Sequence, residues 1–372
     1  MKITKRKAGY SGFTMVGIAA LLAGCAAAPE ETDTGAGAGA GTGGDLDFTP
    51  CIVSDFGGFE DQSFNQSSYA GMEAAADELG VDFQEAESTS EDQYAGNVSG
   101  MVDQGCNFIL TVGFALANAT RDAAQANEDV QFAIIDSALS NDDFSPLELD
   151  NVKPILYDTA QAAFLAGYLA AGHSESGIVG TFGGQQFPSV TIFMDGFADG
   201  VDYYNEQKGA DVQVVGWNKE TQTGSFTGGF EANQTAKTTA EGLLDQGADV
   251  LLPVGGPIFQ SAGEAIRDRN DSAALIGVDS DLYLTAPDFA DLYLTSILKQ
   301  MTDAVQEVTV NAANGEFDAE PYVGTLENDG VDIAPLHDFE TEVDPALVEE
   351  VEAIKEQIIS GELTVESEAT PQ

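Results

Sequence analysis

Lysine and arginine are the residues that this sequence most clearly lacks. Only 13 of its 372 residues are Lys or Arg, against 63 Asp and Glu, so the formal net charge at pH 7 is −50. A chain with this charge repels the phosphates of a nucleic acid and has few cations to displace their counterions, which excludes nucleic-acid binding. The same charge favours a soluble monomer, because like-charged copies repel one another. With 43% hydrophobic residues the chain can still bury the core of one large or two ordinary domains.

Histidine, cysteine and phosphate-binding motifs are also scarce. The two histidines, His173 and His337, lie far apart in the sequence, and no Cys/His cluster accompanies either of them. A structural zinc site is therefore not expected. No GxxxxGK[ST] loop is present to cradle a phosphate. We expect neither a metal nor another cofactor.

The first 24 residues have the composition of a secretory signal peptide. Four cations within the first seven residues precede a largely apolar run from Gly12 to Gly24, which is too short to cross a bilayer as a helix. The run ends in LAGC (22–25), which resembles the lipobox of bacterial lipoproteins. We expect cleavage before Cys25 and a lipid on that residue, which would anchor the protein on the extracytoplasmic face of the cell membrane. The alternative is an ordinary signal peptide that ends near a cysteine.

Residues 25–46 predict a flexible tether, because Pro, acidic residues and a GAGAGAGTGG repeat cannot pack a core. Two further cysteines, Cys51 and Cys106, each precede or begin a predicted parallel strand. In an oxidising export compartment these two cysteines could form a disulfide, but two small buried thiols are the favoured interpretation.

From residue 48 onward, short β-rich apolar runs alternate with segments of helical periodicity. The runs are 51–56, 107–113, 130–136, 177–183, 212–217, 250–255 and 274–279. This alternation predicts βαβ units and parallel sheets, and runs that are apolar on both faces predict strands covered by helices on each side. New series of alternating strands and helices begin near 152 and near 291. This division favours two α/β lobes over the alternative, a barrel of eight βα units.

The expected boundaries follow from these series. One lobe comprises 47–158 plus about 290–320, and the other comprises 159–289 plus part of 321–343. A hairpin is predicted through 322–339. The C-terminal segment 344–372 is predicted to hold an acidic helix from Pro345 to Ser360, followed by a tail.

The first predicted strand leads into a group of polar and aromatic residues. Asp55 ends the strand, Ser63 is a good N-cap residue, and the helix after it carries Asn65 and Tyr69. Phe114 follows the strand 107–113. Because open α/β sheets bind ligands beyond the carboxyl ends of their strands, these residues predict one crevice.

Similar groups follow the strands of the second half. Phe226 lies in a glycine-bearing polar loop, and Gly255 ends a strand where a backbone could approach a ligand closely. Asp279 ends the next strand and could accept hydrogen bonds from a pair of hydroxyls. Lys299 follows an apolar run and is expected to neutralise part of the charge of Asp279.

Several of these segments together resemble the basic membrane protein (BMP) family, the lipoprotein nucleoside-binding components of ABC transporters. They are CIVSDFGGFEDQSFNQSSYAGM (51–72), NVKPILYDTAQAAFLAGYLAA (151–171), GSFTGGFEANQTAK (224–237) and GVDSD (277–281). The resemblance covers about 46–365. It implies a type I periplasmic-binding-protein fold, in which two parallel-sheet lobes joined by a three-crossover hinge close on a purine nucleoside.

The resemblance also implies roles for individual residues. The family's base-binding acid and amide correspond to Asp55 and Asn65, its stacking rings to Tyr69 and Phe226, and its ribose-binding groups to Gly255, Asp279 and Lys299. The chain departs from the family at Glu60-Asp61-Gln62, where relatives have an acidic pair followed by Lys.

The expected function is that of a non-enzymatic, monomeric receptor that delivers a purine nucleoside to an ABC permease. A nucleotide is not expected, because the net negative field would repel its phosphate. A sugar receptor of the same fold is one alternative. A nucleoside hydrolase is a weaker one, because no histidine lies near the candidate crevice in the sequence.

Overall fold

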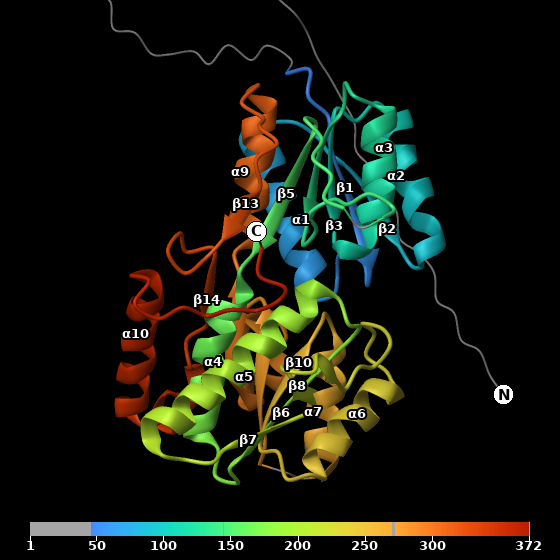
Figure 1. The fold of residues 1–372 in the computed structure, drawn as a ribbon. Coiled ribbons are helices and arrows are strands. Elements are labelled where there is room, and N and C mark those ends of the chain that lie inside the picture. Colours follow the sequence, from blue (N-terminus) through green and yellow to red (C-terminus); the bar gives the residue numbers. More distant parts are fainter. Residues whose placement is uncertain (1–45, 144, 270–271, 372) are drawn as a thin grey trace, which may run out of the picture. The chain divides into compact units, whose positions relative to one another are not determined.

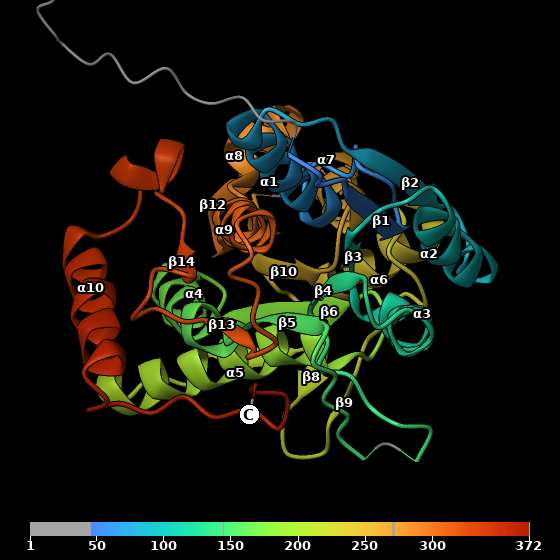
Figure 2. The same ribbon diagram turned by 90° about the horizontal axis from the view of Figure 1, so that it is seen from above.

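A computed structural model describes residues 46–143, 145–269 and 272–371. The predicted signal peptide, Cys25 and all but the last residue of the predicted tether lie outside the described residues. Within the described part, helices and strands alternate along the chain, and the strands form two six-stranded sheets (Figures 1 and 2). The structure is therefore α/β with two lobes, and the barrel alternative is wrong.

Each sheet is built mainly from parallel strands. The first sheet is parallel throughout, in the order β13 (Tyr322–Gly324), β5 (Val152–Tyr157), β4 (Gln131–Ile135), β3 (Phe108–Val112), β1 (Pro50–Phe56) and β2 (Gln84–Ser88). The second sheet has the order β14 (Val331–Ile333), β12 (Tyr293–Lys299), β11 (Ala274–Asp279), β10 (Val250–Val254), β6 (Ile178–Gly183) and β7 (Gln213–Val215). Only β14 runs antiparallel to its neighbour among these described strands. A small antiparallel pair, β8 (Trp217–Asn218) and β9 (Thr223–Gly224), lies outside both sheets.

Helices connect the strands. They are α1 (Phe64–Leu79), α2 (Tyr94–Asp103), α3 (Ala117–Ala126), α4 (Thr159–His173), α5 (Pro188–Lys208), α6 (Gln234–Leu244), α7 (Ile258–Arg269), α8 (Leu282–Thr285), α9 (Met301–Ala313) and α10 (Pro345–Ile359). The predicted C-terminal helix is confirmed as α10. Among the described residues, no helix combines the length and the apolar character needed to span a bilayer.

Both faces of each sheet are buried under helices. In β1, Ile52 packs in the cluster that contains α1 and α9, whereas its neighbour Val53 packs in the cluster that contains α2 and α3. In β10, Leu252 packs in the cluster that contains α4 and α5, whereas Leu251 packs in the cluster that contains α6 and α7. Successive side chains of a strand point to opposite faces, so strands covered on both sides must be apolar throughout.

The described chain passes between the two sheets three times. It crosses from β5 to α4, which packs on the second sheet, from β12 to α9, which packs against α1, and from β13 to β14. Figure 1 shows the orange α9 and β13 beside the blue and green elements of the first sheet. The hairpin predicted over 322–339 is wrong, because β13 pairs with β5 in the first sheet and β14 with β12 in the second. Residues 290–320 were expected in the first lobe, but β12 lies in the second sheet, and the chain returns to the first sheet only at α9.

Cys51 and Cys106 form a disulfide, with their Cα atoms 6.0 Å apart. The favoured expectation of two free thiols is therefore wrong. Cys51 lies in β1 and Cys106 precedes β3, and these two strands are neighbours in the first sheet. Parallel pairing thus brings the two sulfur atoms together across 55 residues of sequence.

We expect the double variant Cys51→Ser/Cys106→Ser to lose about 4 kcal/mol of unfolding free energy, because the cross-link restricts a long loop in the unfolded chain. Urea unfolding of the variant and of the oxidised wild type measures the difference. An unchanged urea midpoint in the variant would contradict the claim that the disulfide stabilises the folded protein.

Candidate functional site

A cavity lies where the carboxyl ends of strands from both sheets meet. The first sheet contributes Asp55 near the end of β1, Gly113 after β3 and Asp136 after β4. The second contributes Gly255 after β10, Asp279 at the end of β11 and Lys299 at the end of β12. Six of the eight residues predicted from the sequence line this cavity, namely Asp55, Asn65, Phe114, Gly255, Asp279 and Lys299.

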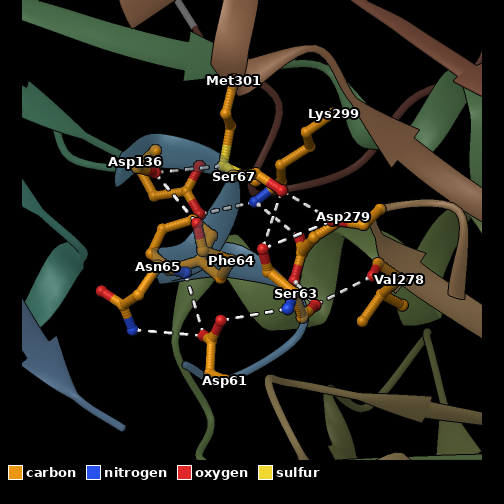
Figure 3. A network of polar contacts seen from close by, with 12 residues as sticks. Asp61, Ser63, Phe64, Asn65, Ser67, Asp136, Val278, Asp279, Lys299 and Met301 are labelled. Atoms are coloured by element: carbon orange, nitrogen blue, oxygen red, sulfur yellow. Dashed lines mark hydrogen bonds and ion pairs between the residues drawn. The ribbon is translucent and has the colours of Figure 1, made fainter. Parts of the chain in front are cut away.

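Lys299 lies at the junction of the two lobes (Figure 3). Its Nζ is 2.5 Å from Oδ2 of Asp136, on the first sheet, and 3.6 Å from Oδ1 of Asp279, on the second. The same ammonium group lies 5.1 Å from the ring centroid of Phe64 and 5.2 Å from that of Phe193. Aromatic faces and two carboxylates therefore compensate a cation whose side chain is only 3% exposed.

The protonation of this cluster follows from burial and charge. Burial lowers the pKa of Lys299, but Asp136 and Asp279 outweigh it, so the pKa lies above the ordinary value. Burial raises the pKa of Asp279 to about 6, although Lys299 opposes the shift. Lys299 is therefore charged at neutral pH and can donate hydrogen bonds to a ligand.

Both carboxylates beside Lys299 come from residues in the left-handed backbone region. Asp136 has a φ of 63° and Asp279 a φ of 70°. Non-glycine residues adopt this conformation at an energetic cost and cluster at functional sites. Each residue ends a strand of a different sheet, and the two carboxylates converge on Lys299.

The amino end of α1 brings a second polar group to the cavity. Asp61 accepts hydrogen bonds from the backbone N–H groups of Ser63 (3.0 Å), Asn65 (2.9 Å) and Gln66 (3.0 Å). Asp61 therefore supplies the capping carboxylate. Ser63 occupies the predicted N-cap position but makes no side-chain capping bond. Its hydroxyl instead donates to the carbonyl of Val278, on the second sheet.

Asp55 and Asn65 lie side by side on the cavity wall. The Asn65 amide donates to Oδ1 of Asp55 at 2.9 Å. Gly113 lies against the Asp55 carboxylate with a φ of 109°, and a Cβ on it would collide with that carboxylate. Burial, partly offset by the Asn65 hydrogen bond, raises the pKa of Asp55 to about 8.

We expect the empty protein to lose stability as the pH rises from about 4 toward 8, through the range in which Asp55 ionises. Because its folded-state pKa lies above the ordinary value of an aspartate, the folded state binds more protons than the unfolded state, so the slope of unfolding free energy against pH is negative. Asp55→Asn should flatten this slope, and urea titrations at several pH values measure it. An equal slope in the variant would contradict the shifted pKa.

Aromatic rings from both lobes line the cavity. The ring centroid of Phe114 lies 5.0 Å from that of Phe187, whose centroid lies 6.0 Å from that of Phe230. Phe187 precedes α5 and Phe230 lies in the loop before α6. Gly255 makes room for Phe230, because a Cβ on this glycine would strike the ring.

The two rings predicted to stack on a base lie elsewhere. Tyr69 packs against Phe59 and Phe83, and its hydroxyl donates to Glu85 at 2.6 Å. Phe226 packs edge-on against Trp217, at 5.9 Å between centroids. Neither residue lines the cavity described above.

The lining residues that were not assigned to the site from the sequence include Asp61, Asp136, Phe187 and Phe230. Asp136 carries a usable signal, because it ends a predicted strand as Asp55 and Asp279 do. Phe230 lies only four residues after Phe226 in the same loop. Loops have no regular side-chain spacing, so the sequence does not indicate which of the two rings faces the cavity.

Comparisons with known proteins agree with this geometry. A family model described as "ABC transporter substrate-binding protein PnrA-like" matches residues 49–369. The "ABC transporter nucleoside-binding protein BmpA" of Lactococcus lactis subsp. cremoris is 28% identical over 338 residues, which cover 86% of this chain and 90% of the relative. "Basic membrane protein A" of Borreliella burgdorferi is 29% identical over 255 residues, 68% of this chain and 69% of the relative.

Solved structures give the same result. A crystal structure of ABC transporter solute-binding proteins from Aeropyrum pernix K1 superposes with a TM-score of 0.76 at 25% identity, over 87% of this chain and 94% of that one. An arabinose-binding protein from Geobacillus stearothermophilus has a TM-score of 0.58 at 15% identity, over 80% of this chain and 99% of that one, which shows a likeness of fold alone.

Proposed function

The chain belongs to the family of PnrA-like ABC transporter substrate-binding proteins, and on that premise we propose that it captures a purine nucleoside outside the cytoplasm and delivers it to an ABC permease. The protein is a monomer in this proposal, anchored by a lipid on Cys25. Closure of the two lobes on the ligand is the signal that the permease recognises, because the ligand contacts both lobes only in the closed form.

One observation carries the proposal. The cavity combines three features that a nucleoside requires: a polar pair for a base edge at Asp55 and Asn65, rings for its faces at Phe187 and Phe230, and a Lys299–Asp279 pair for ribose hydroxyls. Stacking on aromatic rings contributes about 1–3 kcal/mol per base. A buried carboxylate that accepts from ribose hydroxyls rejects analogues that lack them.

The competing functions fit the cavity less well. A nucleoside hydrolase needs a metal or a base that activates water. His337 bonds to Asp281, which caps α8, and neither residue lines the cavity. A sugar receptor would use the carboxylates and one ring, but it leaves the buried acid–amide pair of Asp55 and Asn65 without a ligand edge to bind.

Isothermal titration with guanosine, guanosine monophosphate and arabinose tests the proposal. We expect the nucleoside to bind, the monophosphate to bind more weakly because of the net negative field, and the sugar not to bind. Tighter binding of the monophosphate, or binding of arabinose alone, would overturn the proposal. Release of free base during the titration would indicate an enzyme instead.

A further inference from the structure

The turn before α1 makes direct hydrogen bonds to the opposite lobe, outside the ligand cavity. α1 packs against β1 of the first sheet, whereas α7 packs against β10 and β11 of the second sheet and α8 against β12. Gln62 contacts both of the latter helices. Nε2 of Gln260, in the first turn of α7, donates to Oε1 of Gln62 at 3.0 Å. Oγ1 of Thr285, at the end of α8, donates to the backbone carbonyl of Gln62 at 2.8 Å. These three residues do not line the cavity.

Serine hydroxyls extend this contact between the lobes. Oγ of Ser63, at the start of α1, donates to the carbonyl of Val278 in β11 at 3.0 Å (Figure 3). One turn later in α1, Oγ of Ser67 lies 2.6 Å from Oγ of Ser280, which follows β11. Each bond joins a group of the first lobe to a group of the second. Because only groups of the protein take part, the bonds form whenever the lobes meet in this arrangement, whichever ligand lies between them.

The backbone of Gln62 lies in the left-handed region, with a φ of 61°. A residue with a side chain adopts this conformation at an energetic cost, and it persists only where the surrounding contacts fix it. On one side, Asp61 accepts from the backbone N–H groups of Ser63 and Asn65 and so fixes the entry into α1. On the other side, the turn directs the carbonyl of Gln62 to α8 and its side chain to α7. The costly turn therefore faces the second lobe with both of its polar groups.

We propose that Gln62, Gln260 and Thr285 form an interlobe latch, which stabilises the closed form without contact to the ligand. In this proposal the unliganded protein is a mixture of open and closed forms, and the latch sets their ratio. The apparent affinity of a ligand depends on the fraction of the protein that is competent to bind it. A bond made only in the closed form therefore tightens the binding of every ligand of the site by the same factor. The latch residues are positioning residues for the proposed binding function.

Gln62→Gly separates the latch from a role in folding. Glycine adopts the left-handed conformation without the usual cost, so the urea midpoint of the unliganded variant should equal or exceed that of the wild type. The bond to Gln260 is lost, and we expect the Kd values of guanosine and of inosine to rise by the same factor, about threefold to fivefold. A lower urea midpoint would indicate a merely structural residue, and unequal factors would indicate a ligand contact. Either result would overturn the proposal.

Gln260→Ala removes the same bond from the opposite lobe. Combined with Gln62→Gly, it should weaken guanosine binding no more than Gln62→Gly alone, because the two changes delete one shared interaction. Effects that add in full would contradict the latch. Gln306→Ala is the matched control, because Nε2 of Gln306 donates to Glu78 at 2.8 Å between α9 and α1 of the same lobe. Its Kd for guanosine should equal that of the wild type, and a rise as large as that of Gln62→Gly would contradict the proposal.

Small-angle X-ray scattering of the unliganded proteins tests the latch without the proposed function. We expect the double variant Gln62→Gly/Thr285→Val, which loses the bonds to both helices, to have a larger radius of gyration than the wild type, because more of it is open. Equal radii would overturn the latch and leave nucleoside binding in place. If neither guanosine nor inosine bound to the wild type, the proposed function would fail, and the comparison of the two radii would still decide the latch.

Discussion

Lys299→Met should destabilise the protein by about 3–5 kcal/mol and reduce nucleoside affinity by about a hundredfold or more, because removing one partner leaves buried charges uncompensated. Two carboxylates, on Asp136 and Asp279, would lose the ammonium that lies between the lobes. Methionine keeps the length of the side chain, so packing against Phe64 and Phe193 should change little. Urea unfolding and isothermal titration measure the two losses.

The pH dependence distinguishes this effect from simple loss of packing. Burial raises the pKa of Asp279 to about 6 even beside Lys299, so without the ammonium group its protonation relieves part of the uncompensated charge, and the stability of the variant should recover as the pH falls from 8 toward 5. Lys208→Met is the matched control. Lys208 pairs with Glu350 in a half-exposed ion pair, which contributes at most about 1 kcal/mol. If Lys208→Met reduced stability and nucleoside affinity as much as Lys299→Met, the proposed role of Lys299 in compensating the buried carboxylates of both lobes would be contradicted.

Phe230→Ala should weaken nucleoside binding by about 1–3 kcal/mol, the contribution of stacking one base on one ring. Phe230 lines the cavity, and Gly255 makes room for its ring. The loss should appear in the dissociation constant, because the ring of Phe230 lines the cavity. Titration with guanosine measures it.

Phe226→Ala provides the comparison within the same loop. Its ring packs against Trp217 outside the cavity, so we expect a lower melting temperature and an affinity close to that of the wild type. If Phe226→Ala lost more affinity than Phe230→Ala, the stacking role that the family resemblance implies for Phe226 would hold. The stacking role proposed for Phe230 would then be contradicted.

The strand pattern was predictable because parallel strands buried on both faces are apolar throughout. Each of the seven predicted runs contains a strand. β2 was not predicted, because it is an edge strand of largely exposed polar residues, QEAES, with no apolar alternation to detect. The split of β13 and β14 between two sheets was also missed, since local turn residues resemble those of a hairpin and the partners of both strands lie far away in the sequence.

The site was predictable to the extent that strand ends determine it. Asp55, Gly255 and Asp279 follow or end strands, and parallel topology alone brings such residues to one edge of a sheet. Phe187 and Phe230 come from loops whose paths depend on tertiary contacts, such as the room that Gly255 provides. The disulfide was misjudged for a related reason, because it depends on β1 and β3 being neighbours.

Mass spectrometry of the small molecule released on denaturing the purified, never-dialysed protein tests the central claim most directly. The account predicts a purine nucleoside in the wild type and little or none in Lys299→Met purified in parallel. A sugar, a nucleotide or a free base bound in place of a nucleoside would contradict it.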